Sequence, residues 1–515
     1  MYSNKENVNI LTSLLVAHGV RHAVVCPGSR NAPIVHNLNE CPDIQCFPVT
    51  DERSAGFYAL GMAQALRQPV VVCVTSGTAL LNLAPAVAEA YYQHASVVVI
   101  SADRPEQWID QLDGQTLPQH DALGRFVRKA VSLPEPSDEQ QRWYCNRLVN
   151  EALVVRHAPV HINVPISEPL FNFSVPLLPV ERKIEVLSAD IPAHVLSHVV
   201  RMFMQSERPM LVCGQPMNPH LDEAIRMVEN DSRYVPDLVL YIGGSIVSKR
   251  VKHYLRKAKE TWVVNETGEV TDTFMNLTRV IQGDGDVIAD QVRFMLEQQP
   301  HPFVHLWEEL LARVKEQADG YQPAYSQMAA VRCFERQLDK SRRGTSVHYA
   351  NSTAIRLANI FARHTVYCNR GVNGIEGSLS TAAGFSCVAC DLVFCVVGDL
   401  SFFYDQNALW NQNLRGNLRI LLLNNGKGGI FNMLKGLEQS PARDRLVAGQ
   451  HQTTAEGVCR QNGVEYRVVR QGEQLHDGID WLIETESEHP LLLEVLTDVA
   501  ADERACREYY RLFSI

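Results

Sequence analysis

The sequence has none of the features that would place its chain in a membrane or on nucleic acid. Its first residues, Met1 to Glu6, are polar and carry no apolar stretch of the signal-peptide kind. No apolar run elsewhere reaches the roughly 20 residues that cross a bilayer. Acidic residues outnumber basic ones, and the formal net charge of −10 disfavours a nucleic-acid partner. We therefore expect a cytoplasmic protein that works away from membranes and nucleic acids.

The sequence also lacks the cysteine and histidine patterns of a structural metal site. Its 13 cysteines are scattered through apparent strands and helices, which predicts reduced thiols. Cys387 and Cys390 form the sole C-x-x-C pattern, and no second pair accompanies it to complete a zinc site. None of the 18 histidines stands in a recognisable metal-ligand or triad motif, so no catalytic imidazole is assigned.

What the chain does have is length and a repeated α/β pattern. A chain of 515 residues is too long for one core and predicts about three domains. Apolar strand-like runs alternate with helical stretches in both outer thirds, which indicates an α/β fold with mostly parallel sheets. We expect domains at 1–180, 181–338 and 339–515, with a proline-containing linker from Pro165 to Pro179. In the middle domain, the strands expected at 210–214 and 237–243 leave room for only one helix between them.

Two polar turns in the last third follow apolar runs that suit strands buried on both faces. Asp399 follows the run 392–397, and Asn425 follows the run 420–423. The carboxyl ends of such strands are where parallel sheets bind ligands. Asp399, the Asn425 amide oxygen and a backbone carbonyl near Lys427 would suit Mg²⁺, which takes its other ligands from phosphate and water. The alternative is that both segments are ordinary turns.

Taken together, the two turns resemble the signature of thiamine diphosphate (ThDP) enzymes, Gly-Asp-Gly followed by Asn-Asn at the end of the next strand. The resemblance implies that Asp399, Leu400, Ser401 and Asn425 contact the cofactor. Leu400 departs from the pattern, because the family usually has Gly or Ala there. The backbone at this position therefore approaches the diphosphate less closely.

Glu52 fits the role of the glutamate that a ThDP enzyme requires from elsewhere in its chain. It begins a helix of small residues that runs to about Arg67, followed by a strand at 70–74 and a loop at 76–78. This order resembles the pyrimidine domain of the family, and it implies that Ser76, Gly77 and Thr78 also contact ThDP. Glu52 would drive the pyrimidine to the imino tautomer that takes the thiazolium C2 proton. The alternative is an acidic residue placed favourably in the first turn of a helix.

Five segments narrow the resemblance to the 2-succinyl-5-enolpyruvyl-6-hydroxy-3-cyclohexene-1-carboxylate synthase family of menaquinone biosynthesis. They are Cys26 to Pro33, Thr50 to Ala55, Thr75 to Ala79, Ser101 to Pro105 and Asn369 to Gly377. The resemblance implies decarboxylation of 2-oxoglutarate on ThDP with Mg²⁺ or Mn²⁺, and addition of the succinyl carbanion to isochorismate. It also implies a homodimer or homotetramer. The family's central domain usually has an extra strand and loop, so either this domain is trimmed or a flexible segment is missing from the sequence.

The resemblance also assigns substrate contacts, which suit guanidinium groups because both substrates carry carboxylates. Arg30 and Arg370 are implied, with Glu52, as catalytic residues. Apolar contacts to the cofactor are implied for Ile375, the wedge that bends ThDP, and for Phe431. The substrate set implied by the family pattern is Ser29, Arg30, Arg104 and Gln115 for isochorismate, Lys249 and Arg250 as a basic pair, Ser352 and Arg356 as the clamp on the succinyl carboxylate, and Arg370 beside the reaction centre.

Simpler explanations exist for some of these residues. Lys249 and Arg250 are equally well explained as solvated surface charges, and apolar residues such as Ile375 and Phe431 are usually core. Two rival functions also remain at this point. A different ThDP carboligase, such as an acetolactate synthase, would share Glu52 and the metal ligands. A degenerate ThDP fold kept as a binding protein would have lost them.

Overall fold

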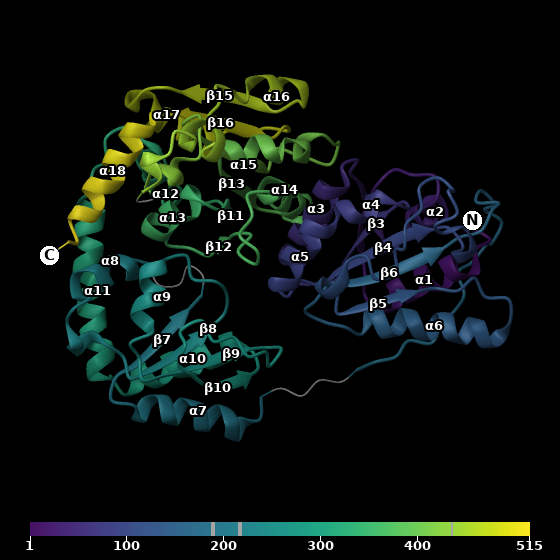
Figure 1. The fold of residues 1–515 in the computed structure, drawn as a ribbon, viewed down its shortest axis with the longest axis horizontal. Coiled ribbons are helices and arrows are strands. Elements are labelled where there is room, and N and C mark those ends of the chain that lie inside the picture. Colours follow the sequence, from purple (N-terminus) through teal and green to yellow (C-terminus); the bar gives the residue numbers. More distant parts are fainter. Residues whose placement is uncertain (187–190, 215–218, 434–435, 515) are drawn as a thin grey trace.

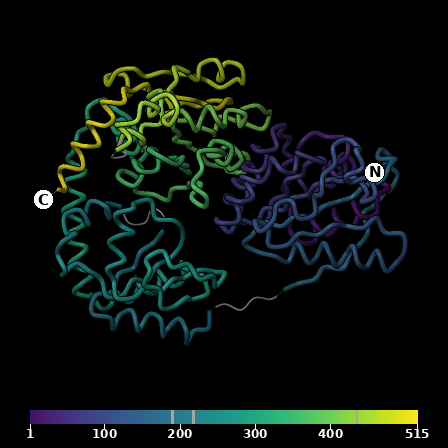
Figure 2. Tube along the Cα trace, in the orientation of Figure 1, coloured from purple at the N-terminus to yellow at the C-terminus, as the bar shows by residue number. Residues whose placement is uncertain are grey.

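The computed structural model describes residues 1–186, 191–214, 219–433 and 436–514, and it divides into three parallel-sheet units. Figure 1 shows the N-terminal unit on one side of the molecule and the middle and C-terminal units together on the other. Figure 2 follows the chain through them in sequence order. Every strand pair in the three sheets is parallel across the described residues, so the predicted α/β fold is confirmed.

The N-terminal sheet has six strands in the order β2-β1-β3-β4-β6-β5. Its middle strands are runs of valine and isoleucine that are buried throughout, as expected for strands covered on both faces. The strands are β1 (His22–Val25), β2 (Gln45–Pro48), β3 (Val70–Val74), β4 (Val97–Asp103), β5 (Lys129–Ser132) and β6 (Val160–Pro165). The helices are α1 (Glu6–Ala17), α2 (Ala32–Glu40), α3 (Glu52–Leu66), α4 (Thr78–Asn82), α5 (Ala84–Tyr92) and α6 (Glu139–Leu153).

The middle sheet has four strands in the order β10-β9-β8-β7. Buried residues of α7 and α10 pack on one face of it, where Phe203, Trp262 and Ile288 share one cluster. A single α-helix, α8, connects β7 to β8 in the described residues, as the sequence predicted. The strands are β7 (Pro209–Cys213), β8 (Leu238–Ile242), β9 (Glu260–Asn265) and β10 (Leu277–Gln282). The helices are α7 (Ala193–Gln205), α8 (Leu221–Val228), α9 (Lys249–Leu255), α10 (Gly285–Gln298) and α11 (Pro302–Gly320).

The C-terminal sheet has six strands in the order β12-β11-β13-β14-β16-β15. The two runs predicted from the sequence are its centre, since β13 and β14 are hydrogen-bonded neighbours. The strands are β11 (Thr345–Tyr349), β12 (Val366–Tyr367), β13 (Leu392–Gly398), β14 (Leu418–Asn424), β15 (Glu465–Val469) and β16 (Leu491–Leu496). The helices are α12 (Gln327–Leu338), α13 (Thr353–Phe361), α14 (Ser378–Val388), α15 (Asp399–Tyr404), α16 (Glu456–Gln461), α17 (Leu475–Glu484) and α18 (Val499–Arg511).

The N-terminal and C-terminal units meet where α3 crosses α14 (Figure 1). Glycines allow this approach: a Cβ atom at Gly61 would overlap the carbonyl oxygen of Thr381, and one at Gly384 would overlap the Tyr58 backbone. Nearby, the Tyr58 hydroxyl donates a hydrogen bond of 2.6 Å to the carbonyl oxygen of Ala408. The beginning of α3, where Glu52 lies, is therefore held against the C-terminal unit.

The long helices of this chain pack in the protein core. No helix in the four described ranges combines the length and apolar character needed to cross a bilayer.

The expected domain limits at 180 and 338 lie outside all three sheets, between β6 and β7 and between β10 and β11. The limits themselves stay a prediction.

Candidate active site

Asp399 and Asn425 lie together at the carboxyl edge of the C-terminal sheet. Asp399 begins α15 immediately after β13, and Asn425 follows β14 directly. Asp399 is 5% exposed, and its Oδ2 accepts hydrogen bonds from the N–H groups of Gly426 at 2.8 Å and Asn425 at 3.2 Å. Among the described residues, the Asn425 amide oxygen receives one long contact, 3.4 Å from the Lys427 N–H. A carboxylate and a largely free amide oxygen therefore lie on adjacent turns of one sheet edge.

The side chains around this pair include a histidine that no sequence motif singles out. His451 Nε2 lies 3.4 Å from Asp399 Oδ2, and the interaction with this carboxylate raises the pKa of the imidazole. His451 stands in no motif, because only the fold brings it back to β13. The Lys427 side chain points away to Asp444, at 2.9 Å, so only its backbone is free for a ligand. Ser401 donates a short hydrogen bond to the carbonyl oxygen of Ile375, which ties the expected wedge residue to α15.

Glu52 and the loop after β3 lie at the carboxyl edge of the N-terminal sheet. Asp51 caps α3 by accepting a hydrogen bond of 3.1 Å from the Ser54 N–H, and Glu52 is the first helical residue. Glu52 accepts a hydrogen bond of 3.3 Å from Asn82 on the turn after Thr78. Gly77 has a φ of +83°, and a Cβ there would press on the backbone of Gln115. The expected contact residue Thr78 begins α4, whose last residue, Asn82, donates the bond to Glu52.

Arg30 and Arg104 line a cavity of about 630 Å³ beside this edge. Arg30 is 6% exposed and donates to the carbonyl oxygen of Ile166 at 3.0 Å and to Glu168 at 3.1 Å. Arg104 pairs with Asp113 at 2.9 Å. Ser29, next to Arg30, is exposed. Guanidinium groups held in place by these bonds form a preorganised site for a carboxylate ligand.

A buried polar network supports the loop that carries Gln115. Gln119 accepts a hydrogen bond of 2.7 Å from the Gly77 N–H and donates to Asn163 at 2.8 Å. Asn163 also accepts from Ser101 at 2.8 Å and donates to Asp103 at 2.9 Å. These side chains are all less than 5% exposed. The network therefore fixes the Gly77 turn against β4 and β6.

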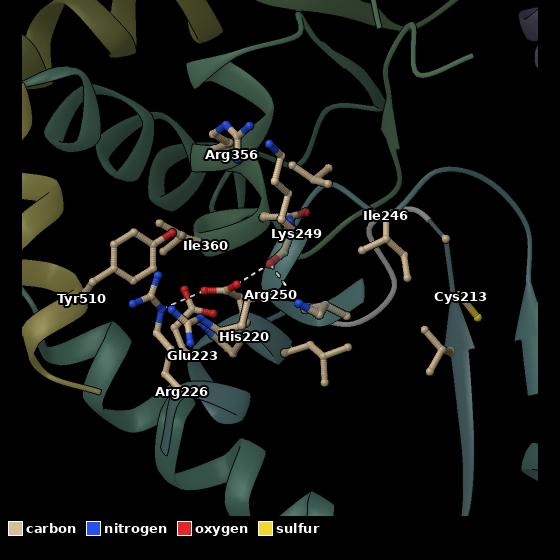
Figure 3. Close-up of a pocket in the computed structure, with 18 of the residues that line it drawn as sticks. Cys213, His220, Glu223, Arg226, Ile246, Lys249, Arg250, Arg356, Ile360 and Tyr510 are labelled. Carbon is tan, nitrogen blue, oxygen red and sulfur yellow. Dashed lines mark hydrogen bonds and ion pairs between the residues drawn. The ribbon is translucent and has the colours of Figure 1, made fainter. Parts of the chain in front are cut away.

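Arg356, Lys249 and Arg250 line a second cavity, of about 600 Å³, between the middle and C-terminal units. Figure 3 shows Arg356 and Lys249 above it and Tyr510 of α18 at its side. Arg356 Nε is buried without a hydrogen-bond partner, and neither Arg356 nor Lys249 forms an ion pair in the described part of the chain. Arg250 does pair, with Glu229. The cavity thus offers two cations that form no ion pair with the described residues, and Asp222 and Glu223 also line it. Ile430, Asn359 and His220 also line it, and the sequence did not single them out.

Arg370 lies on the loop before α14, close to the start of α13. Its guanidinium donates to Asn351 at 3.2 Å and approaches the Ser245 hydroxyl at 3.5 Å. Burial lowers the pKa of Arg370, and the charge of Arg356 acts in the same direction. Ser352 precedes α13 with a φ of +74°, so it is the residue before the helix rather than its first turn. Ile375 is 39% exposed, which a core residue would not be.

The residues at the C-terminal edge fit the diphosphate end of ThDP with its metal. Asp399 and Asn425 carry hard oxygen atoms of the kind that Mg²⁺ or Mn²⁺ takes beside phosphate, so this edge would suit either metal. Across the described residues, no group of three or more His, Cys, Asp and Glu side chains gathers into another metal site.

Comparison with protein families identifies the cofactor. The model described as thiamine pyrophosphate enzyme, N-terminal TPP binding domain, matches residues 6–124. The model described as thiamine pyrophosphate enzyme, C-terminal TPP binding domain, matches residues 350–495. These ranges contain Glu52 and Asp399, respectively. The chain is therefore a ThDP enzyme.

Comparison with curated proteins identifies the family. A Bacteroides thetaiotaomicron protein named 2-succinyl-5-enolpyruvyl-6-hydroxy-3-cyclohexene-1-carboxylate synthase is 41% identical over 99% of both chains. Bacteroides fragilis and Porphyromonas gingivalis proteins of the same name are 43% and 32% identical, over 99% or more of this chain and 98% or more of their own. This chain belongs to the 2-succinyl-5-enolpyruvyl-6-hydroxy-3-cyclohexene-1-carboxylate synthase family. It is a ThDP-dependent enzyme of the transferase type, which sets aside the acetolactate synthase and binding-protein alternatives.

The alignment with the Bacteroides thetaiotaomicron synthase spans 556 positions, more than the 515 residues of this chain. That synthase therefore carries residues that this chain lacks. Within the chain, the structure places predicted synthase residues at the Asp399 edge, at the Glu52 edge, in the Arg30 cavity and in the Arg356 cavity. The Arg30 cavity is lined by residues 30 to 168 and the Arg356 cavity by residues 212 to 510, so the two share no residue.

Proposed function

We propose that this chain decarboxylates 2-oxoglutarate and joins the succinyl unit to isochorismate, with ThDP and Mg²⁺, in menaquinone biosynthesis. The products are CO₂ and 2-succinyl-5-enolpyruvyl-6-hydroxy-3-cyclohexene-1-carboxylate. The observation that carries the proposal is the pairing of ThDP-type metal ligands with two cavities that present cationic side chains. Two dicarboxylate substrates require such cations, since charge-assisted hydrogen bonds contribute about 1.5–3 kcal/mol each.

The cofactor residues have distinct tasks in this proposal. ThDP, when bound, supplies a carbon nucleophile and an electron sink for decarboxylation. Asp399, Asn425 and the Lys427 carbonyl hold the Mg²⁺ that anchors the diphosphate, beside Leu400 and Ser401. Glu52 holds a proton at the pyrimidine, whose neighbours are Ser76, Gly77 and Thr78. Ile375 and Phe431 pack against the cofactor and keep water from it.

The substrate residues divide into a donor set and an acceptor set. Arg356 with Ser352 binds the distal carboxylate of 2-oxoglutarate, and Arg370 lies beside the reacting carbons. Ser29, Arg30, Arg104 and Gln115 orient isochorismate, and the basic pair Lys249 and Arg250 binds it from the middle unit.

The two cavities also bear on the oligomeric state. Arg30 and Arg104 of the acceptor set line one cavity of the chain, and Arg356 of the donor set lines another. A second copy of the chain can bring its N-terminal cavity to the donor cavity of the first. We therefore include a homodimer or homotetramer in the proposal, together with a cytoplasmic location.

An assay with ThDP, Mg²⁺, 2-oxoglutarate and isochorismate tests this function. We expect CO₂ release and formation of the coupled product, both of which disappear when the metal is chelated. Pyruvate serves as the control substrate, because it lacks the distal carboxylate. Turnover of pyruvate in place of 2-oxoglutarate would refute the proposed donor.

A further inference from the structure

A buried carboxylate, Glu89, joins the N-terminal unit to the loop that carries Arg370. Glu89 lies on α5 and is 2% exposed. Its Oε1 accepts a hydrogen bond of 2.7 Å from the Gly371 N–H, and its Oε2 accepts one of 2.7 Å from the Val372 N–H. Two consecutive backbone donors thus hold both oxygens of one carboxylate, as backbone nests hold anions.

The approach of α5 to this loop depends on further contacts and on a glycine. Gln93, one turn after Glu89, donates hydrogen bonds to the Glu89 carboxylate and, at 3.4 Å, to the carbonyl oxygen of Cys368. Gln64 of α3 donates to Gln93 at 2.6 Å. A Cβ at Gly371 would lie 2.9 Å from the Glu89 carbonyl oxygen and 3.0 Å from its Oε1, closer than side chains pack. Residues of the N-terminal unit and of the Arg370 loop therefore both shape this contact.

The other side of the same loop is held by Asn351. Its amide nitrogen donates to the carbonyl oxygens of Asn369 at 2.6 Å and Gly374 at 2.7 Å. Its amide oxygen accepts from the Arg370 guanidinium at 3.2 Å. Asn351 directly precedes Ser352 and lies five residues before Arg356. The loop that carries Arg370 and leads to Ile375 is therefore fixed between Glu89 and Asn351.

Glu89 depends on this loop as much as the loop depends on Glu89. In the described part of the chain its carboxylate forms no ion pair within 4 Å, and its bonds come from two backbone amides and Gln93. A buried charge that loses its hydrogen bonds is strongly destabilised, so the loop cannot move away without a large cost. An ordinary apolar contact between α5 and the loop would allow sliding, whereas this one fixes both the position and the orientation of residues 371 and 372.

We propose that Glu89 is a positioning residue for the donor half of the reaction. It acts through residues 369–375, holding Arg370 beside the reacting carbons of the 2-oxo acid and Ile375 against the cofactor. This inference rests on the proposed function, because the donor role of Arg370 belongs to that proposal. The residue itself touches neither substrate nor cofactor. The N-terminal unit of a chain thereby sets the geometry of the donor pocket in the C-terminal unit of the same chain.

The test compares Glu89→Gln and Glu89→Ala with wild type in the full-length protein, with the exposed Glu139→Gln as the matched control. Gln keeps the shape but can accept from only one of the two amides. At saturating ThDP, and at a temperature where all variants are folded, kcat/KM for 2-oxoglutarate should fall in the order wild type, Gln, Ala. A misplaced catalytic loop lowers kcat/KM by about tenfold to a hundredfold. The KM for isochorismate should be unchanged, and Glu139→Gln should match wild type.

Amide hydrogen exchange of the peptide containing residues 369–375 gives a second measurement that needs no substrate. We expect faster exchange in both Glu89 variants. Exchange at the wild-type rate in Glu89→Ala would overturn the proposal. Faster exchange with an unchanged kcat/KM for 2-oxoglutarate would overturn it too. A loss of activity that only follows the fraction of unfolded protein would overturn it as well. If wild type releases no CO₂ from 2-oxoglutarate, the proposed function fails instead, and the exchange measurement still decides whether Glu89 holds the loop.

Discussion

Replacing Arg356 by alanine should impair the donor step and leave the acceptor step largely intact. Arg356 lies at the second helical turn of α13 and faces the 600 Å³ cavity, with its Nε buried and unpartnered. The substitution therefore removes a cation that makes no internal ion pair in the described residues, and the free protein loses little. Loss of one charge-assisted contact to a carboxylate costs on the order of 1.5–3 kcal/mol, which is about tenfold to about a hundredfold in kcat/KM for 2-oxoglutarate.

The acceptor-side comparison is Arg30→Ala, which should preserve CO₂ release while carboligation with isochorismate fails. Arg30 differs from Arg356 because it already binds the Ile166 carbonyl oxygen and Glu168. Its removal leaves a buried carbonyl unsatisfied, so a fall in the thermal midpoint is expected as well. The exposed Arg342→Ala is the control for loss of an arginine in the C-terminal unit.

Steady-state kinetics with each substrate varied, and single-turnover measurement of CO₂ release, distinguish the two variants. We expect Arg356→Ala to raise the KM for 2-oxoglutarate and slow CO₂ release, and Arg30→Ala to do neither. Equal impairment of both substrates in both variants would refute the division of the pocket into donor and acceptor halves, even with the overall reaction correct.

Three further outcomes follow from the described residues. Asp399→Ala should abolish ThDP binding at ordinary Mg²⁺ concentrations with the circular dichroism spectrum unchanged; wild-type affinity by calorimetry would remove Asp399 from the metal site. Glu52→Gln should bind ThDP yet exchange its C2 proton far more slowly, since an amide drives tautomerisation poorly; unchanged exchange by quenched-flow NMR would exclude that role. Glu223→Gln tests a pH effect: burial, and then the charge of Asp222, raise the pKa of Glu223 from 4.5 to about 7, so the folded protein keeps a proton that the unfolded chain loses. Stability from this group is complete below pH 4.5 and declines as the pH rises to about 7. The variant should gain on the order of 3 kcal/mol over wild type between pH 5 and pH 8 in urea unfolding, and a difference that does not change with pH would contradict the assignment.

The sequence predicted the central strands and the metal edge because those signals are local. Runs such as 70–74 and 420–423 are apolar throughout and have one structural interpretation, and the polar turns after them need no other part of the chain. Short or mixed strands gave weaker signals. β12 has only two residues. β15 alternates exposed and partly buried positions up to its last residue, and it carries charged side chains at Glu465 and Arg467.

Contacts between distant segments could not be predicted. His451 reaches Asp399, and Glu89 reaches Gly371, only through the packing of the sheets, and no spacing rule along the chain records either contact. The same limit applies to the two cavities. The sequence supplied the arginines, but only the fold shows that Arg356 and Lys249 share a cavity and that Arg30 and Arg104 share another.

The crossing of α3 and α14 has a consequence for the history of the chain. Adding ten to each strand number in the order β2-β1-β3-β4-β6-β5 gives the order β12-β11-β13-β14-β16-β15, so the two sheets share one topology. Helices α3 and α14 each precede the third strand, in chain order, of their own sheet. The two equivalent helices meet, and each contributes one glycine to the contact. An isologous contact in a two-fold dimer has the same arrangement. The chain therefore has the internal pseudosymmetry that fusion of two copies of one ancestral domain would leave. The two units differ at their ligand edges, where the N-terminal unit carries Glu52 and the C-terminal unit carries Asp399 and Asn425.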